Sequence, residues 1–242
     1  MSCEKCFQEA FSLKKPTVDY TGFRLSRIKE PRFRHLLLLV SWPVYLVLYF
    51  ALERAYPLEQ CYSVHCALDD AMAFNEVFVV PYVGWYFLLA FTVLYFMFYD
   101  LENFKGFQIF LIVTEVVALT TYAIFPTRVD FQPETMPRDN LFSDIIGLLY
   151  AVDVNTNACP SLHVAFSLGI GSAWSKRKQT RLWVKLMIWA MAILICLSTV
   201  FTKQHSVLDF VWALPMCLLA EIVAYGRSYW LPKFKKQPAL NK

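Results

Sequence analysis

Two residues near the end of the chain have the types and spacing of a nucleophilic pair. His205 and Asp209 are four positions apart, and on a helix this spacing places both side chains on one face. A carboxylate beside an imidazole fixes the tautomer and stabilises a positive charge on the ring. The other ring nitrogen of His205 is then directed outward as a nucleophile or base. The structural alternative is an aspartate that caps a helix beside an interfacial histidine.

A second histidine lies at a predicted helix start. Pro160 ends an irregular stretch, Ser161 is a favoured N-cap residue, and His163 falls in the first turn. A helix N-terminus gathers free N–H groups and the positive end of the helix dipole, which together favour bound anions. His163 can there donate a proton to a phosphate oxygen. With Lys203 nearby, the two segments predict a phosphate site that needs neither a metal nor another cofactor.

These residues resemble the type-2 phosphatidic acid phosphatase superfamily. Pro160-Ser161-Leu162-His163 is similar to its second signature, and Ser198…His205-x-x-x-Asp209 is similar to its third. That superfamily includes lipid phosphate phosphatases, vanadium haloperoxidases and lipid phosphotransferases, and its membrane members have six spans with the site at the non-cytoplasmic face. The resemblance covers roughly residues 126–215. It implies that His205 forms a phosphohistidine, that Asp209 orients it, and that His163 protonates the leaving alkoxide.

The chain departs from the superfamily pattern in three places. The first signature, a lysine, six intervening residues and then Arg-Pro, is absent. Thr199 replaces the usual arginine, and Leu162 replaces the usual glycine. The Pro-Ser-Leu-His and Lys-Gln-His forms look more like the branch containing inositol phosphorylceramide synthases, which move a head group between lipids. We assign phosphate binding to four residues: Lys203, Arg128, Ser161 and Ser198.

The elements that must position these residues are apolar helices. Of the 242 residues 57% are hydrophobic and 17% are charged, whereas a soluble domain carries about 25% charged residues. This composition excludes a disordered chain or a nucleic-acid-binding tail. A bilayer-spanning helix needs about 20 apolar residues. Six stretches qualify or nearly qualify: His35–Leu52, Val77–Tyr99, Gly106–Phe125, Ser161–Trp174, Leu182–Phe201 and Val207–Tyr225.

The fourth stretch is shorter than a full span. Its 14 residues give a helix of roughly 21 Å, so it must begin below the membrane surface or bring irregular chain in with it. Irregular backbone at that depth is tolerated where it is packed in protein or lines a wet cavity. This makes Ser161 an early candidate for a site.

The loop charges predict the orientation. Residues 1–34 hold eight lysines and arginines, and the segment 176–181 and the tail 226–242 are also basic. Lysine and arginine concentrate on the cytoplasmic side, so both termini are expected there. The segments 53–76, 126–160 and 202–206, and the site with them, are expected on the opposite side.

We therefore predict an all-α, polytopic membrane protein with six transmembrane helices. A basic segment 1–34 and a basic tail 226–242 flank a catalytic membrane domain, 35–225. The outer 3–4 segment should contain a short interfacial helix near residues 141–150. Cys61 and Cys66 lie close enough in sequence for a disulfide, but two free thiols are an equal alternative.

The predicted function is metal-independent removal of phosphate from a membrane lipid through a phosphohistidine. Transfer of a phosphoryl head group to a lipid hydroxyl stays open, because either acceptor resolves the same intermediate. A transporter would spread ionisable residues along a path through the bilayer, whereas here they cluster at one face. A non-catalytic scaffold is the third alternative, and the lipid and the oligomeric state stay open.

Overall fold

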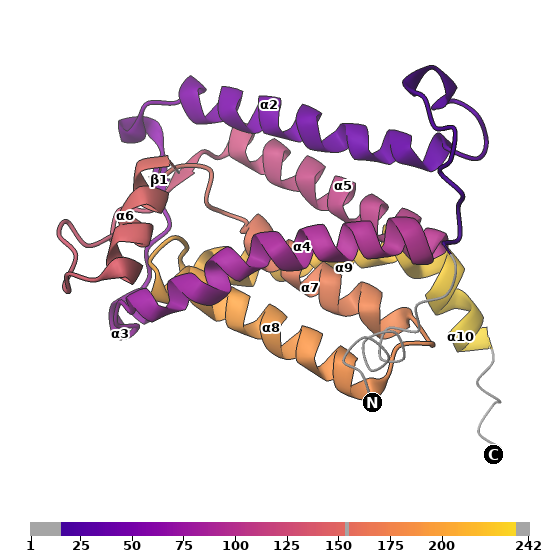
Figure 1. The fold of residues 1–242 in the computed structure, drawn as a ribbon. Coiled ribbons are helices and arrows are strands. Elements are labelled where there is room, and N and C mark those ends of the chain that lie inside the picture. The colour runs from indigo at the N-terminus through magenta and orange to yellow at the C-terminus, as the bar shows by residue number, and fades with distance from the viewer. Residues whose placement is uncertain (1–15, 153–154, 236–242) are drawn as a thin grey trace, which may run out of the picture.

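The computed structural model describes residues 16–152 and 155–235, and helices dominate it (Figure 1). The elements follow in the order η1 (Leu25–Arg27), η2 (Arg34–Val40), α2 (Ser41–Ala55), η3 (Leu58–Gln60), β1 (Tyr62–Ser63), α3 (Ala67–Ala71), η4 (Glu76–Phe78), α4 (Val79–Tyr99), α5 (Leu101–Ile124), β2 (Thr127–Arg128), α6 (Leu141–Val152), α7 (Leu162–Lys176), α8 (Leu182–Phe201), α9 (Val207–Tyr225), η5 (Gly226–Trp230) and α10 (Leu231–Lys235). The two short strands pair in parallel. The predicted all-α class is confirmed.

Among the residues that the structure describes, five helical stretches are long and apolar enough to cross a membrane. They are Arg34–Ala55, Glu76–Tyr99, Leu101–Ile124, Leu182–Phe201 and Val207–Lys235. The fourth predicted span forms α7, which has 15 residues and falls short of that length. It is bounded by the N-cap Ser161 on one side and by the basic turn after Lys176 on the other. The membrane class is thus confirmed, and the structure contains five such stretches where the sequence predicted six.

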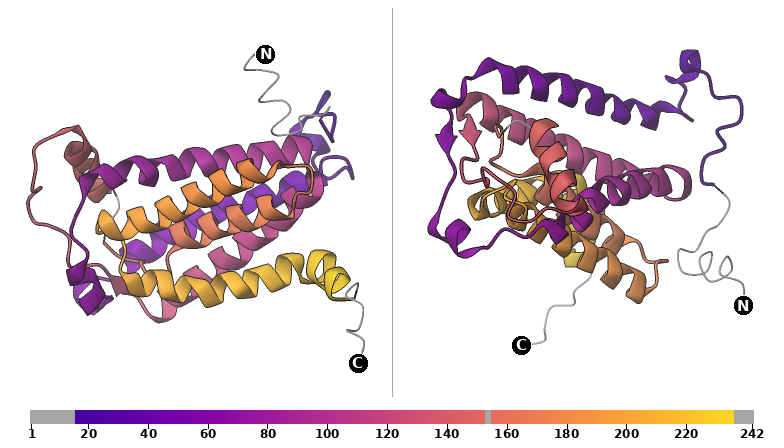
Figure 2. Two further views of the ribbon diagram at one scale, coloured as in Figure 1. Left: turned by 90° about the horizontal axis from the view of Figure 1, so that it is seen from below. Right: turned by 60° about the vertical axis from the view of Figure 1, so that its left-hand side comes forward.

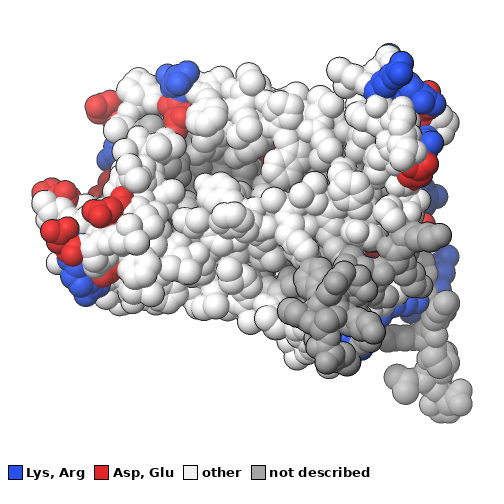
Figure 3. All heavy atoms as spheres, viewed as in Figure 1, with Lys and Arg blue, Asp and Glu red and all other residues white. Residues whose placement is uncertain are grey.

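Charged side chains gather at the two ends of the molecule. On the face in Figure 3 the middle is a broad uncharged band, as expected of helices that cross a hydrocarbon core of about 30 Å. Figures 1 and 2 place α3 and α6 at one end, and the segment that precedes α2 together with α10 at the other. The two ends of the described chain therefore lie on the same side of the bundle.

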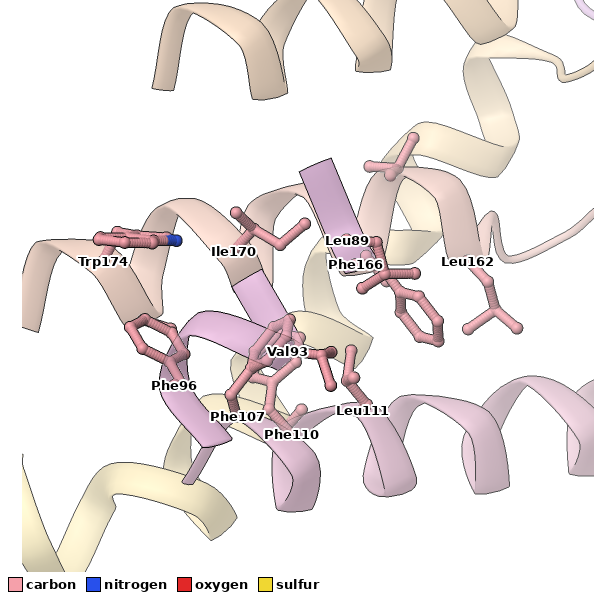
Figure 4. Packing of buried hydrophobic residues seen from close by; sticks show 14 of the residues in the cluster. Leu89, Val93, Phe96, Phe107, Phe110, Leu111, Leu162, Phe166, Ile170 and Trp174 are labelled. Carbon is pink, nitrogen blue, oxygen red and sulfur yellow. The ribbon is translucent and has the colours of Figure 1, made fainter. Parts of the chain in front are cut away.

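The central element of the bundle is α7, which packs against α4, α5, α8 and α9. Aromatic and aliphatic side chains of α4, α5 and α7 meet there, among them those of Leu89, Val93, Phe96, Phe107, Phe110, Phe166, Ile170 and Trp174 (Figure 4). A Cβ on Gly169 would lie 2.5 Å from the ring of Phe110. The absence of a side chain at Gly169 is what lets α5 and α7 approach so closely.

The turn between the second and third spans is a single residue. Asp100 follows α4 and caps α5, since its side chain accepts a hydrogen bond from the Asn103 backbone at 3.2 Å. The sequence prediction that the third span starts at Gly106 was therefore too late. The Asp100 cap starts the helix several residues before the apolar run begins. The polar residues that follow Asp100 therefore form the first turns of α5.

The end of the bundle that carries α3 and α6 also carries the outer segments. A helix forms where the short interfacial helix was predicted, as α6, and its Tyr150 hydroxyl donates to the Thr202 carbonyl at 2.5 Å. Cys61 and Cys66 are both free thiols. Cys3 and Cys6, which form a C-x-x-C pattern in the sequence, lie outside the described residues.

Candidate active site

His205 and Asp209 meet at the start of α9. Asp209 is fully buried, and its Oδ2 lies 3.0 Å from His205 Nδ1 and accepts the Ser206 backbone N–H at 3.0 Å. His205 itself precedes the helix, because Ser206 is the N-cap. The predicted contact is therefore made by a carboxylate that reaches back over the cap, instead of by two residues stacked on a helix. The same Asp209 oxygen caps α9 and contacts the His205 imidazole. The capping aspartate and the aspartate that orients a histidine, which were alternatives in the sequence, are therefore compatible.

His163 faces His205 from the first turn of α7. The two ring centroids are 5.6 Å apart, and the His163 ring packs against Trp85 at 4.4 Å and Tyr82 at 4.8 Å. Among the described residues, its Nε2 atom has no hydrogen-bond partner. The two aromatic rings hold the imidazole in place and leave that nitrogen available to a ligand.

The starts of α7 and α9 are joined directly. Ser161 caps α7 by accepting the Val164 N–H at 3.4 Å, and the Ser161 N–H donates to the Asp209 carbonyl at 3.2 Å. The dipoles of both helices thus add positive potential near the two histidines. A bound phosphate oxygen would be stabilised there.

A left-handed residue shapes each loop that leads into the site. Lys203 has φ of 55° and Asn157 has φ of 56°, a region that residues other than glycine seldom adopt. The turn at Lys203 lets the N–H groups of Gln204 and His205 both donate to the Thr199 carbonyl at 3.0 Å. Thr199, which stands where the superfamily has arginine, therefore anchors the histidine loop through its backbone.

The predicted phosphate-binding cations have protein partners. Lys203 Nζ donates to the carbonyl of Asp69 at 2.6 Å and to that of Met72, and burial lowers its pKa although Asp69 and Asp70 oppose that change. Arg128 Nη1 donates to the Leu58 carbonyl at 2.7 Å.

Three of the seven predicted site residues, His163, His205 and Asp209, come together, with Ser161 beside them. Lys203 and Arg128 do not line the cavity described below, and the buried Ser198 hydroxyl donates to the Ile195 carbonyl at 2.6 Å. Phosphate binding by Lys203, Arg128, Ser161 and Ser198 stays a prediction.

A cavity of about 640 Å³ ends at the two histidines. Side chains of α2, α4 and α7 form its walls, and they are mainly aromatic and aliphatic. Along α4 the lining runs from Tyr82 to Leu94, a length of about 18 Å at 1.5 Å per residue. In Figure 3 the surface is hollowed between α2 and α4. The cavity is thus a long apolar groove with its polar groups at one end, and we call it the α2–α4 groove.

Asp69 in α3 is a site-supporting residue that the sequence did not reveal. Its buried carboxylate accepts the Ser206 hydroxyl at 2.6 Å, the Val207 N–H at 2.8 Å and the Cys66 N–H at 2.9 Å. Cys66 and Asp69 have the spacing of a capping box, and this spacing is a sequence signal that could have identified Asp69 as a helix-capping residue. Nothing in the sequence shows that the same carboxylate reaches the residue next to His205.

Within residues 16–152 and 155–235, no group of three or more His, Cys, Asp and Glu side chains is arranged to hold a metal ion. Comparison with known proteins gives no match to a protein-family profile, a curated protein or a solved structure. The functional argument consequently rests on the geometry of the site.

Proposed function

We propose that the protein is an integral-membrane enzyme that cleaves a lipid phosphate ester through a phosphohistidine. One observation carries the proposal: His205, oriented by Asp209, faces His163 at 5.6 Å between ring centroids, at the polar end of the α2–α4 groove. A histidine oriented by a carboxylate can act as a nucleophile, and a second histidine opposite it can serve as the general acid. The resemblance of the two signature segments to the type-2 phosphatidic acid phosphatase superfamily agrees with this chemistry.

In the proposed reaction, Nε2 of neutral His205 attacks phosphorus. A phosphorus–nitrogen bond forms and the bond from phosphorus to the lipid alcohol breaks, while His163 gives its proton to the departing alkoxide. The acceptor then attacks the phosphohistidine, His163 takes the acceptor's proton, and His205 leaves as the neutral base. Asp209 stabilises the positive charge on His205 in the intermediate, and the N-termini of α7 and α9 stabilise the phosphate oxygens.

The groove supports a lipid as the substrate. Its length along α4, about 18 Å, is close to the depth of one leaflet, half of a hydrocarbon core of about 30 Å. A lipid whose phosphate lies between the histidines would place a chain along Trp42, Tyr45, Tyr49 and Phe166. The walls formed by α2 and α4 are the route by which such a chain would move in from the bilayer.

We propose six membrane crossings, with α7 as the fourth. The two ends of the described chain lie on one side of the bundle (Figure 1), which agrees with an even number of crossings. The helices around α7 bury eleven of its 15 residues, so this short helix needs little lipid-facing length of its own. The basic segments before the first span and after α7 support a cytoplasmic location for both, and hence a non-cytoplasmic site.

Water and an alcohol are the two candidate acceptors. With water the enzyme is a lipid phosphatase, which is our first candidate. The second candidate, transfer to a lipid hydroxyl, is favoured by the predominantly apolar walls of the groove, because these restrict water near the intermediate. Product analysis with and without an added alcohol separates the two reactions.

The test uses purified full-length protein in vesicles that contain labelled phosphatidate. We expect turnover by the wild type, loss of at least a thousandfold in His205→Ala, and acid-labile phosphate on protein that retains His205. His65→Ala is the matched control, because His65 is exposed and pairs with Asp70 at 2.8 Å. Equal activity of His205→Ala and His65→Ala would overturn the proposed function.

A further inference from the structure

A second cavity lies at the end of the bundle opposite the two histidines. Its volume is about 380 Å³, and its walls come from the turn between α4 and α5 and from the basic turn after α7. The Thr17 N–H donates to the Phe98 carbonyl at 2.7 Å, so the α4–α5 turn lies beside the segment that precedes α2. We call this cavity the turn cavity. Among the described residues, the charged side chains that line it are Asp100, Glu102, Lys105 and Arg177.

Arg177 is a buried cation with unused hydrogen-bonding capacity. Its side chain is 4% exposed, and its guanidinium lies over the Tyr95 ring at 5.1 Å from the centroid. Nη1 donates to the Thr180 hydroxyl at 2.9 Å. Within the described chain, Nε has no hydrogen bond and lies 3.3 Å from Asp100 Oδ2 without the alignment of one. Buried polar atoms are normally hydrogen-bonded, so an unsatisfied guanidinium in the wall of a cavity indicates an acceptor supplied by a ligand.

The first turn of α5 adds donors to the same cavity. Leu101 and Glu102 are the first two residues of this 24-residue helix, and both line the cavity. N–H groups of the first turn have no partner within a helix, and the Asp100 cap accepts instead from the Asn103 N–H at 3.2 Å. The helix dipole also makes this end partly positive. The helix start and the guanidinium together favour a phosphate oxygen.

The formal charges of the turn cavity balance. Asp100 forms an ion pair with Arg177, while Glu102 and Lys105 are both exposed and lie three residues apart on α5. A purely anionic ligand would meet two carboxylates here, and a purely cationic ligand would meet a buried guanidinium. A zwitterion avoids both penalties when its anionic group lies at Arg177 and its cationic group lies at Glu102.

We propose that the turn cavity binds an ethanolamine phosphodiester, in which a singly charged phosphate is joined to an ammonium group. The phosphate accepts from Arg177 and from the first N–H groups of α5, with Lys105 beside it, and the ammonium group bonds to the Glu102 carboxylate. The same chemistry occurs in glycerophosphoethanolamine and in the head group of phosphatidylethanolamine. The site is separate from the proposed active site, because none of the described residues that line it also lines the α2–α4 groove.

The test is isothermal titration calorimetry of the purified full-length protein. The probe is glycerophosphoethanolamine, and glycerophosphoglycerol serves as a phosphodiester without an ammonium group. We expect the ethanolamine compound to bind at least about fivefold more tightly. Equal affinities for the two compounds, or binding of neither, would overturn the inference.

The source of the ligand is tested by competition. The protein is placed in nanodiscs of phosphatidylglycerol with or without phosphatidylethanolamine, and glycerophosphoethanolamine is the titrant. Weaker apparent binding in the presence of phosphatidylethanolamine would support the site with the lipid as its ligand. Unchanged binding would support the site with the free compound as its ligand.

Glu102→Gln separates the ammonium contact from the phosphate contact. The variant should weaken glycerophosphoethanolamine about fivefold, the upper value for an exposed ion pair, and should not weaken glycerophosphoglycerol. Glu59→Gln is the matched control, because Glu59 is also exposed and lies in the first turn of a helix, η3, outside the turn cavity. Equal weakening of both compounds by Glu102→Gln would contradict the contact.

Arg177→Gln removes the main phosphate contact and should weaken both compounds at least about tenfold. Because Arg177 is buried, its melting temperature is measured alongside, and Lys105→Gln tests the same contact at an exposed position with an expected loss of about threefold. Lys178→Gln, at an exposed neighbour that does not line the cavity, is the control. No effect of Lys105→Gln and Arg177→Gln would overturn the inference.

Binding to the turn cavity should not depend on the proposed nucleophile. His205→Ala should bind glycerophosphoethanolamine as the wild type does, because His205 lines the other cavity. Loss of binding in His205→Ala would place the ligand in the α2–α4 groove and overturn the inference. A protein that binds the compound through Glu102 but turns over no lipid would defeat the proposed function alone.

Discussion

The side chains of Asp69 and Ser206 are 137 positions apart in sequence and meet at 2.6 Å. Asp69 also accepts the Val207 N–H at 2.8 Å, so one carboxylate from the outer segment holds the first residues of α9. In the opposite direction, the Lys203 ammonium group donates to the backbone carbonyl of Asp69 at 2.6 Å. The loop that carries His205 is therefore fixed on both sides by α3, which makes Asp69 a positioning residue.

Replacing Asp69 by Asn should loosen this attachment. The amide can still accept from Val207, but its NH₂ group cannot accept the Ser206 hydroxyl. We expect kcat to fall about tenfold with little change in KM, and stability to fall by about 2 kcal/mol, typical of a hydrogen bond to a charged group. The control is Asp70→Asn at the exposed neighbour, and identical behaviour of the two variants would contradict the role.

The same contact predicts a pH dependence of stability. Burial alone would raise the pKa of Asp69, but hydrogen bonds from Ser206, Val207 and Cys66 outweigh it and hold the pKa below its usual value. A lowered folded-state pKa gives stability that is present above the unfolded value of about 3.9 and is lost as the pH falls through the folded value. The difference in melting temperature between wild type and Asp69→Asn should hold from pH 7 to pH 5 and shrink below pH 4.

Replacing Asp209 by Asn should separate the fold from the chemistry. The variant keeps an oxygen that caps α9 but loses control of the His205 tautomer, which costs about 10⁴ in kcat in serine-protease triads. We expect a comparable loss, measured by phosphate release from a lipid ester. Asp144→Asn, at an exposed carboxylate in α6, should be near wild type. Activity within tenfold of wild type in Asp209→Asn would argue against the pair.

The proposed orientation predicts which positions an impermeant thiol reagent reaches. In a background without the native cysteines, Glu134→Cys in the outer 3–4 segment should react on intact cells. Gln179→Cys in the basic turn after α7 should react after the cells are opened. Both positions are exposed in the structure, so a difference in labelling reports the side of the membrane. The reverse pattern would place the site on the cytoplasmic side.

Close packing of α7 predicts a sharp difference between two glycines. A Cβ on Gly169 would meet the Phe110 ring at 2.5 Å, whereas a Cβ on Gly147 in α6 has nothing within 4 Å. Gly169→Ala should lower stability by about 1–3 kcal/mol through overpacking. Gly147→Ala should be neutral or stabilising by up to about 1 kcal/mol, as expected in a helix. Thermal unfolding in one detergent compares the two variants directly.

The proposed mechanism uses side chains and helix N-termini to hold the phosphate. We expect activity to survive a chelator, and we expect vanadate to inhibit because it adopts the five-coordinate geometry of phosphorus during transfer. Phosphate release with and without chelator is the measurement. Loss of activity in chelator that magnesium restores would require a different mechanism.

The sequence was sufficient for the helices because apolar runs and caps are local signals. The bounds predicted for the last two spans, Leu182–Phe201 and Val207–Tyr225, are those of the helices α8 and α9, although the last apolar stretch continues to Lys235. The start of α5 at Leu101 was missed, because the Asp100 cap acts on polar residues that hydropathy assigns to a loop. The length of α7 followed from its sequence, but its central position depends on contacts with four other helices.

The site was predictable as far as its residues are neighbours in sequence. The contact of His205 with Asp209 was predicted, but for the wrong reason, because His205 precedes α9 and Asp209 reaches it as part of the helix cap. The position of His163 follows from the Ser161 cap. The attachment to Asp69 and the apolar lining of the groove depend on residues from segments far apart. Lys203 shows the same limit: its charge suggested a phosphate ligand, whereas its ammonium group bonds to backbone carbonyls of α3 and the residue after it.

The packing of His163 on Tyr82 and Trp85 has a consequence for how the thickness of the bilayer would act on the proposed reaction. These two rings lie three and six residues after Val79, the first residue of α4, or roughly 5 to 9 Å along the helix. A reacting head group must therefore descend below the level at which the neighbouring span begins. The energetic cost of that descent rises with the thickness of the hydrocarbon layer, so short-chain lipids should speed the reaction and long-chain lipids or sterols should slow it. Membrane thickness would then regulate turnover without any effector molecule.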